Sequence, residues 1–225
     1  MRHGRALGIG GADWSRYLKK AIFCSWCYVD ITSARGLSQL AAVGEAGFLS
    51  AAFDVCTDWS QSRQLGAAHF DHLVAAYVTD PETRQLASEL YRVKCAGGFR
   101  DDGLERGIPA LRLVLRAVGR ASDKQQQWGS LEEVGRALQL VDDVLDVEQD
   151  RRRNELNCLL TPEGAHHARR LLALWDDGQF QIWFGNDATV LNYVIGAAVK
   201  KCLRVLSVPG ELLQPAPGIC DGSQT

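Results

Sequence analysis

The chain has 225 residues, with 25 Lys and Arg against 27 Asp and Glu, which gives a formal net charge of −2. Apolar residues make up 46% and charged residues 23%, a composition typical of globular proteins that excludes a disordered or fibrous chain. The absence of a basic excess argues against a nucleic-acid partner. No apolar run approaches the roughly 18 residues of a membrane span, and the first residues lack the apolar core of a signal peptide. We therefore expect one cytoplasmic domain over residues 1–208, followed by a flexible tail over 209–225.

Apolar residues recur every three or four positions along nearly the whole chain, and the alternation typical of β-strands is absent. This pattern predicts an all-α, single-domain bundle of about eight helices around a central cavity. The expected helices span 13–29, 37–59, 63–78, 81–96, 102–121, 130–152, 163–176 and 187–206. Pro109 lies inside the fifth of them and predicts either a kink or a later helix start.

The seven cysteines show no regular spacing, which argues against a disulfide framework. Cys24 and Cys27 form a C-x-x-C pair, but no second pair with the spacing of a zinc site follows. We expect reduced thiols that pack as small apolar side chains.

Two carboxylates extend the apolar stripe of the helix expected over 37–59. Asp54 and Asp58 lie one turn apart, on the side that carries Leu40 and Val43. Like charges at this spacing repel each other, and the C-terminal end of a helix disfavours anions. A shared cation would relieve both costs. The alternative is a helix that ends near residue 53, with both aspartates in solvent.

A second group of carboxylates lies on the helix expected over 130–152. Its predicted buried stripe consists of Leu131, Val134, Leu138, Val141 and Leu145. Asp142 and Asp146 fall directly beside this stripe, whereas Asp143 and Asp150 lie further round the helix. Carboxylate oxygens suit Mg²⁺, which keeps open positions for a diphosphate. A solvated acidic face is the alternative, but carboxylates beside apolar stripes on two helices favour a metal site.

The sequence Asp142-Asp143-Val144-Leu145-Asp146 resembles the second aspartate-rich motif of trans-prenyl diphosphate synthases and related terpene synthases. Its continuation from Glu148 to Asn157 is similar to the Asp-Arg…Leu-Asn stretch of bacterial large terpene synthases of the tetraprenyl-β-curcumene synthase type. The first motif, Asp54-x-x-x-Asp58, is similar to the Asp-x-x-x-Asp of squalene and phytoene synthases.

This resemblance implies a class I terpene synthase. Such an enzyme ionises a linear prenyl diphosphate with Mg²⁺, releases pyrophosphate and cyclises or deprotonates the allylic cation. The resemblance implies catalytic roles for Asp54, Asp58, Asp142 and Asp146. The implied metal ligands are Asp54, Asp58, Asp142, Asp143, Asp146 and Asp150. The expected diphosphate ligands are Arg92 or Lys94, Arg151 and Asn157.

An allylic cation would need a dry cavity in which aromatic faces stabilise positive charge. The candidate lining residues are Trp26, Phe48, Phe53, Trp59, Trp175 and Trp183. For each of them, ordinary core packing is the alternative.

Three other functions compete with a terpene synthase. A chain-elongating prenyl diphosphate synthase uses two similar acidic helices, but usually with a second leading Asp where this chain has Phe53. An all-helical nucleotide pyrophosphohydrolase favours Glu-x-x-Glu spacing, which Glu132-Glu133 does not offer. A non-catalytic helical interaction protein, or an inactive relative, would fit a chain shorter than the usual core of the family. We also expect no integral membrane segment and consider a homodimer.

Overall fold

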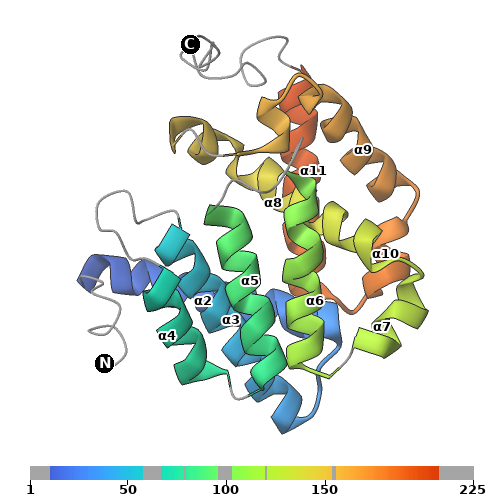
Figure 1. Cartoon of the computed structure of the whole chain (residues 1–225). Helices are drawn as coiled ribbons and strands as arrows, with labels where there is room; N and C mark the ends of the chain where they lie inside the picture. The colour runs from blue at the N-terminus through green and yellow to red at the C-terminus, as the bar shows by residue number, and fades with distance from the viewer. Residues whose placement is uncertain are drawn as a thin grey trace. The chain divides into compact units, whose positions relative to one another are not determined.

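The computed structural model describes residues 11–57, 67–78, 80–95, 103–119, 121–153 and 156–207. Over these residues the protein is all helical, with ten α-helices, two short 3₁₀ helices and no strand, which confirms the predicted all-α class (Figure 1). In the same part of the chain, no helix is long and apolar enough to cross a bilayer. The predicted tail over 209–225 lies outside the described residues.

The chain divides into two compact units. The first consists of residues 1–98 and 109–129, and the second of residues 99–108 and 130–225. The single bundle around one central cavity therefore stays a prediction, and each unit is described by itself below.

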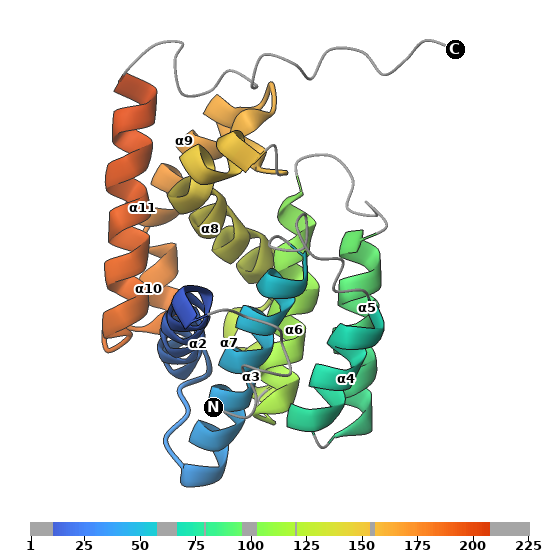
Figure 2. The same ribbon diagram turned by 90° about the vertical axis from the view of Figure 1, so that its left-hand side faces the viewer.

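The first unit contains α2 (Gly11–Thr32), α3 (Leu37–Thr57), α4 (Ala67–Tyr77), α5 (Pro81–Cys95), most of α6 (Gly107–Ala117) and α7 (Ala121–Trp128). Helices α4 and α5 lie side by side (Figure 2). Their contact is centred on Phe70 and Tyr91, whose rings stack with centroids 4.6 Å apart. Both rings belong to an apolar core that Tyr17, Ala21 and Leu49 extend to α2 and α3.

Helices α2 and α3 approach closely because Gly47 has no side chain. A Cβ atom on Gly47 would lie 2.0 Å from Ser25 Oγ and 2.6 Å from the backbone oxygen of Ala21. Two tyrosines of α2 reach α3 from the same side. Tyr17 donates to the backbone oxygen of Phe48 at 3.3 Å, and Tyr28 Oη lies 2.6 Å from Ser50 Oγ. One face of α2 therefore packs against α3.

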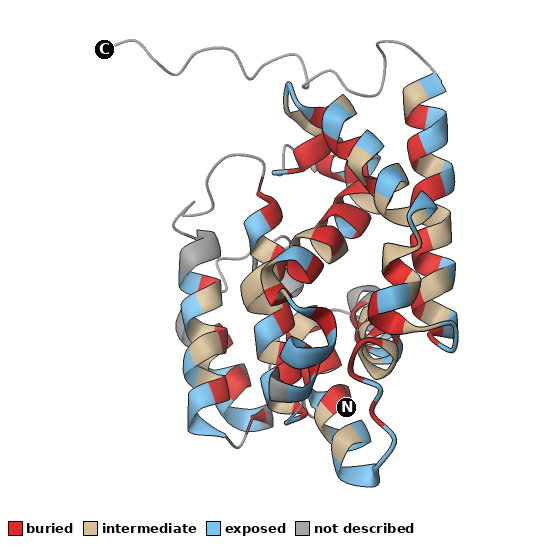
Figure 3. Cartoon of the chain, turned by 90° about the vertical axis from the view of Figure 1, so that its right-hand side faces the viewer, coloured by how far each residue is buried: buried red, intermediate tan, exposed pale blue. Residues whose placement is uncertain are grey.

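The second unit is built around α8. It contains η2 (Leu104–Arg106), α8 (Leu131–Arg153), η3 (Cys158–Leu160), α9 (Gly164–Asp176), α10 (Gln179–Phe184) and α11 (Thr189–Ser207). Helix α8 contacts η2, η3, α9 and α11, and buried positions follow it along most of its length (Figure 3). The Lys201 ammonium joins α11 to α8, donating to the backbone oxygen of Leu145 and to Glu148 Oε2 at 2.8 Å each.

The helix starts follow local chemistry that the sequence predicts. Ser130 Oγ accepts a hydrogen bond from the backbone N–H of Glu133 at 3.2 Å, as expected of an N-cap. Pro81 is the first residue of α5. The helix expected from residue 102 begins at Gly107, after η2, so Pro109 lies in its first turn. The prediction of a later start there is confirmed.

Two short helices were not expected. Helix α7 follows Gly119, whose φ is +66°, and α10 follows Gly178, whose φ is +69°. Each glycine adopts a left-handed conformation that ends one helix and turns the chain into the next.

The buried face of α8 differs from the predicted stripe. Leu138 and Leu145 are only half-buried, whereas Leu140, Val144 and Val147 are buried. Leu131, Val134 and Val141 are buried as predicted, so the buried face keeps part of the predicted stripe and extends beyond it. The reason is that α8 contacts several elements, and apolar residues occupy most of its circumference.

Candidate functional site

Two glycines bring Arg106 to the side of α8. A Cβ atom on Gly107 would lie 2.0 Å from the backbone oxygen of Gly135, and one on Gly135 would lie 2.8 Å from the Cα of Ile108. The backbone after η2 therefore rests directly on the first half of α8. This contact lies two turns before Asp143 on α8 and places Arg106, the last residue of η2, beside that residue.

That partner is Asp143, whose exposed fraction is 1%. Its Oδ1 accepts hydrogen bonds from Arg106 Nη2 at 2.9 Å and from Gln139 Nε2 at 2.7 Å. Its Oδ2 accepts one from the backbone N–H of Cys158 at 2.8 Å. Both carboxylate oxygens are thus used inside the protein, as a buried carboxylate requires.

Asn157 connects the end of α8 to the turn that follows it. Its Nδ2 donates to the backbone oxygen of Asp143 at 2.7 Å and to Asp150 Oδ2 at 2.8 Å. Its Oδ1 accepts from the backbone N–H of Leu159 at 2.9 Å, which caps η3. Asn157 is itself buried. Its amide therefore supports the turn, in contrast to the expectation that it binds diphosphate.

Burial raises the pKa of the Asp143 carboxyl from 3.8 to about 7. The neighbouring Arg106 guanidinium and the N–H of Cys158 lower this pKa, and the negative charge of Asp142 raises it. Loss of hydration outweighs the attraction of the guanidinium because the carboxyl has almost no contact with water. Asp143 therefore changes charge near neutral pH.

Asp142 and Asp146 form a second, outward pair on α8. Asp142 is exposed and Asp146 is half-buried, one turn further along. Gln139 Nε2 lies 3.4 Å from Asp142 Oδ2, a much longer contact than the one it makes with Asp143. Asp142 thus offers carboxylate oxygens to solvent, next to a carboxyl whose own oxygens are occupied.

The first acidic motif falls largely outside the described residues. The backbone of Asp54 belongs to α3, but its side chain is not described, and Asp58 lies beyond the described part of the chain. Helix α3 belongs to the first unit and α8 to the second. The pairing of the two acidic helices around a metal therefore stays a prediction. Among the residues whose side chains are described, no group of three His, Cys, Asp or Glu is placed to hold a metal ion.

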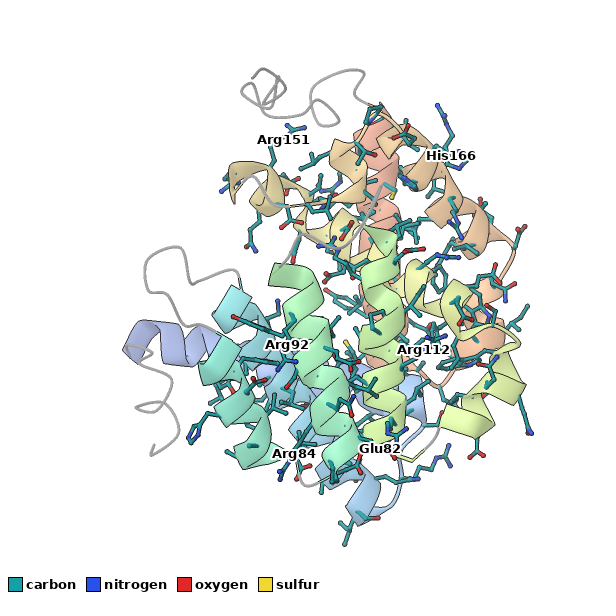
Figure 4. All side chains as sticks on the ribbon, viewed as in Figure 1. Glu82, Arg84, Arg92, Arg112, Arg151 and His166 are labelled. Atoms are coloured by element: carbon teal, nitrogen blue, oxygen red, sulfur yellow. The ribbon has the colours of Figure 1, made fainter. Side chains whose placement is uncertain are left out.

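The predicted cationic ligands have different surroundings. Arg92 is an exposed residue of α5, and its Nη2 lies 3.5 Å from Asp71 Oδ2. Lys94 lies on the same helix, but its side chain is outside the described set. Arg151 is half-buried near the end of α8 (Figure 4).

The aromatic residues proposed to line a cavity are divided between the two units. Trp183 is buried and packs edge-to-face against Phe180 within the second unit. Trp26 is 60% exposed on α2. Phe48 packs against the core of the first unit, and Trp175 is half-buried. The side chain of Phe53 and the whole of Trp59 are outside the described residues.

Sequence reasoning missed Arg106 and Gln139. Gln139 could have been found, because it precedes Asp143 by one turn. Leu140, Asp143, Val147 and Asp150 also follow one another at helical 3-4-3 spacing, which indicates that Asp143 and Asp150 share the buried face. Arg106 gives no such signal, since its approach depends on the contact between Gly107 and Gly135 in space.

Comparison with known proteins gives no match: no protein-family profile, no curated protein and no solved structure is significantly similar to this chain.

Proposed function

We propose that this protein is a Mg²⁺-dependent class I terpene synthase that uses Asp142 and Asp146 to bind the diphosphate of a linear prenyl diphosphate. The observation that carries the proposal is the exposed carboxylate of Asp142, one turn from that of Asp146 on α8, beside the hydrogen-bonded network of Asp143. The proposal includes a cytoplasmic enzyme that releases pyrophosphate and cyclises or deprotonates the allylic cation.

The donor set of the outward pair fits Mg²⁺. This ion takes hard oxygen ligands, and commonly one or two carboxylates together with water and phosphate oxygens. Asp142 supplies exposed carboxylate oxygens, and Asp146 lies one turn away. When bound, Mg²⁺ would act as a Lewis acid on the diphosphate leaving group.

Asp143 and Asp150 fit a metal less well than the sequence suggests. Both oxygens of Asp143 accept hydrogen bonds from Arg106, Gln139 and the N–H of Cys158. Oδ2 of Asp150 accepts one from Asn157. A metal bound through either residue would compete with these internal bonds for the same carboxylate. We therefore assign Asp143 and Asp150 to positioning α8, and Asp142 and Asp146 to the metal.

The remaining residues of the proposal come from the sequence analysis: Asp54, Asp58 and Arg151 from the resemblance, and Arg92 or Lys94 as nearby cations. Asp54 and Asp58 would supply the second set of carboxylates. Arg151, together with Arg92 or Lys94, would neutralise charge on the diphosphate. Asn157 is left out of this set because its amide is already bonded within the turn.

The test is incubation of the purified full chain with Mg²⁺ and C10 to C25 prenyl diphosphates, with mass spectrometry of the extracts and a pyrophosphate assay. We expect a hydrocarbon or alcohol together with stoichiometric pyrophosphate, and no turnover in EDTA. Asp142→Ala should abolish turnover and leave the circular dichroism spectrum unchanged. Glu133→Ala, which removes an exposed carboxylate near the start of α8, is the matched control and should retain activity.

Other outcomes of the same experiment decide against the proposal. A longer diphosphate that forms only with added isopentenyl diphosphate would indicate a chain-elongating synthase. Retained activity in folded Asp142→Ala would remove this residue from the site. No product from any substrate would favour a non-catalytic helical protein or an inactive relative.

A further inference from the structure

Helix α2 carries apolar side chains on two opposite faces. Its inner face contacts α3 through Tyr17, Ala21, Ser25 and Tyr28. At about 100° per residue, a different set of residues lies on the opposite side. We call this set the outer face of α2; it consists of Lys19, Ile22, Phe23, Trp26 and Asp30.

The apolar centre of the outer face is open to solvent. Ile22 is 50% exposed, Phe23 49% and Trp26 60%. They are three of the larger exposed apolar residues in the described part of the chain, and they lie within two turns of one helix. A contiguous patch of this kind is typical of an interaction site. A helix that is apolar on opposite faces normally buries both of them.

The charges at the two ends of the outer face differ in sign. The exposed Lys19 and the half-buried Lys20 precede the apolar centre, and the half-buried Asp30 follows it. Lys19 and Asp30 are eleven positions apart, about 16 Å along a helix. A second copy of α2 packed antiparallel would therefore place Lys19 of each copy opposite Asp30 of the other. Parallel packing would instead oppose like charges.

The same antiparallel arrangement matches the apolar centre. A two-fold axis between residues 24 and 25 sets Phe23 of each copy opposite Trp26 of the other. An isologous interface needs this self-complementarity, in which residue i meets j and residue j meets i. Aromatic pairs of this kind are common at the centres of interfaces.

We propose that the outer face of α2 is a self-association surface through which two copies of this chain pair antiparallel. An anionic lipid surface would fit less well, because Asp30 places a negative charge at one end of the patch. Three exposed side chains per copy provide a few hundred Å², less than the roughly 800 Å² per partner of a standard interface. The expected dimer is therefore weak, with a dissociation constant in the micromolar range.

The test is sedimentation velocity of the full chain between about 1 and 100 µM, a range that spans micromolar affinities. We expect a concentration-dependent monomer–dimer equilibrium. Trp26→Ser should shift the protein to monomer over this range, with an unchanged circular dichroism spectrum. Tyr193→Ser, which removes an aromatic that is 79% exposed on α11, is the matched control and should leave the equilibrium unchanged.

Charge reversal tests the antiparallel arrangement itself. Lys19→Glu should weaken the dimer about five- to tenfold, because it opposes Asp30 twice in a symmetric pair. The double variant Lys19→Glu/Asp30→Lys restores opposite charges and should recover most of this loss. Recovery is not expected from any change in fold alone.

Three outcomes would overturn the inference. They are a monomer at every concentration, a dimer that Trp26→Ser leaves intact, and charge reversals that do not compensate each other. Binding of the monomer to phosphatidylserine vesicles, lost in Trp26→Ser, would assign the outer face to a lipid surface instead. None of these measurements depends on enzymatic activity, so the inference and the proposed function fail separately.

Discussion

The inner and outer carboxylates of α8 have opposite surroundings, although they alternate within nine residues of one helix. Asp143 accepts hydrogen bonds from Arg106 and from the N–H of Cys158 in the turn after the helix, and Asp150 accepts one from Asn157. Asp142 is exposed and Asp146 half-buried. The comparison shows that an aspartate-rich motif need not act as one unit. Its buried residues can fix the geometry of the helix while another residue of the motif, here Asp142, stays exposed.

Removing Arg106, the cation bonded to the buried Asp143, should have the largest effect on stability. Arg106→Met leaves the buried Asp143 without its guanidinium and should lower the free energy of unfolding by about 3 kcal/mol. Urea denaturation measures this change. The matched control is Arg136→Met, because Arg136 also joins α8 to η2, through a more exposed ion pair with Glu105 at 3.3 Å. That variant should cost less than about 1 kcal/mol. Equal losses would contradict a special role for Arg106.

The amide of Asn157, which joins the backbone oxygen of Asp143 to the carboxylate of Asp150, comes next. Asn157→Ala removes three buried hydrogen bonds and leaves the N–H of Leu159 without its acceptor. We expect the free energy of unfolding to fall by about 2–3 kcal/mol. Thermal or urea denaturation would show it. A stable variant with impaired diphosphate binding would instead return Asn157 to the substrate-binding residues.

The buried carboxyl of Asp143 should also make the free energy of unfolding depend on pH. Burial raises the folded pKa of Asp143 to about 7, whereas its ordinary value is 3.8. Between these values the folded protein holds a proton that the unfolded chain has released. The contribution of Asp143 to stability is therefore present at low pH and is lost as pH rises toward 7. We expect a loss of about 2 kcal/mol between pH 5 and 7, from about 1.4 kcal/mol for each pKa unit.

Asp143→Asn removes the titrating group and tests this prediction. Its stability should vary less with pH than that of the wild type when urea midpoints are compared across the same range. A slope that is unchanged in the variant would mean that other groups cause the pH dependence.

Helix α8 also shows which features the sequence predicts and which it does not. The helical class and the N-cap at Ser130 depend on residues that are adjacent in sequence, and both are confirmed. The predicted buried face of α8 is confirmed at Leu131, Val134 and Val141 and wrong at Leu138 and Leu145, because two apolar stripes compete along the helix. One runs through Leu138 and Leu145, and the other through Leu140 and Val147, and only contacts with η2, η3, α9 and α11 select between them.

The candidate site shows the same division. Asp142 and Asp146 follow from the spacing of a motif, and their ability to bind a metal stays a prediction. The partnership of Arg106 with Asp143 joins residues 37 positions apart. It depends on the close contact between Gly107 and Gly135. No local pattern encodes such a contact, so the sequence alone could not show that Asp143 is occupied.

We expect the smallest effect on the free energy of unfolding from a change at Asp142. Asp142→Asn removes an exposed charge that repels Asp146 one turn away and also raises the pKa of Asp143. The variant should therefore gain up to about 0.5 kcal/mol in the free energy of unfolding. Its Asp143 should titrate at a lower pH, which shifts the pH dependence of stability downward in the same urea experiment. A marked loss of stability would mean that Asp142 supports the fold as Asp143 does. A small gain combined with loss of turnover would instead show that α8 keeps a repulsive pair of carboxylates at a cost to stability, as expected if the pair serves a cation.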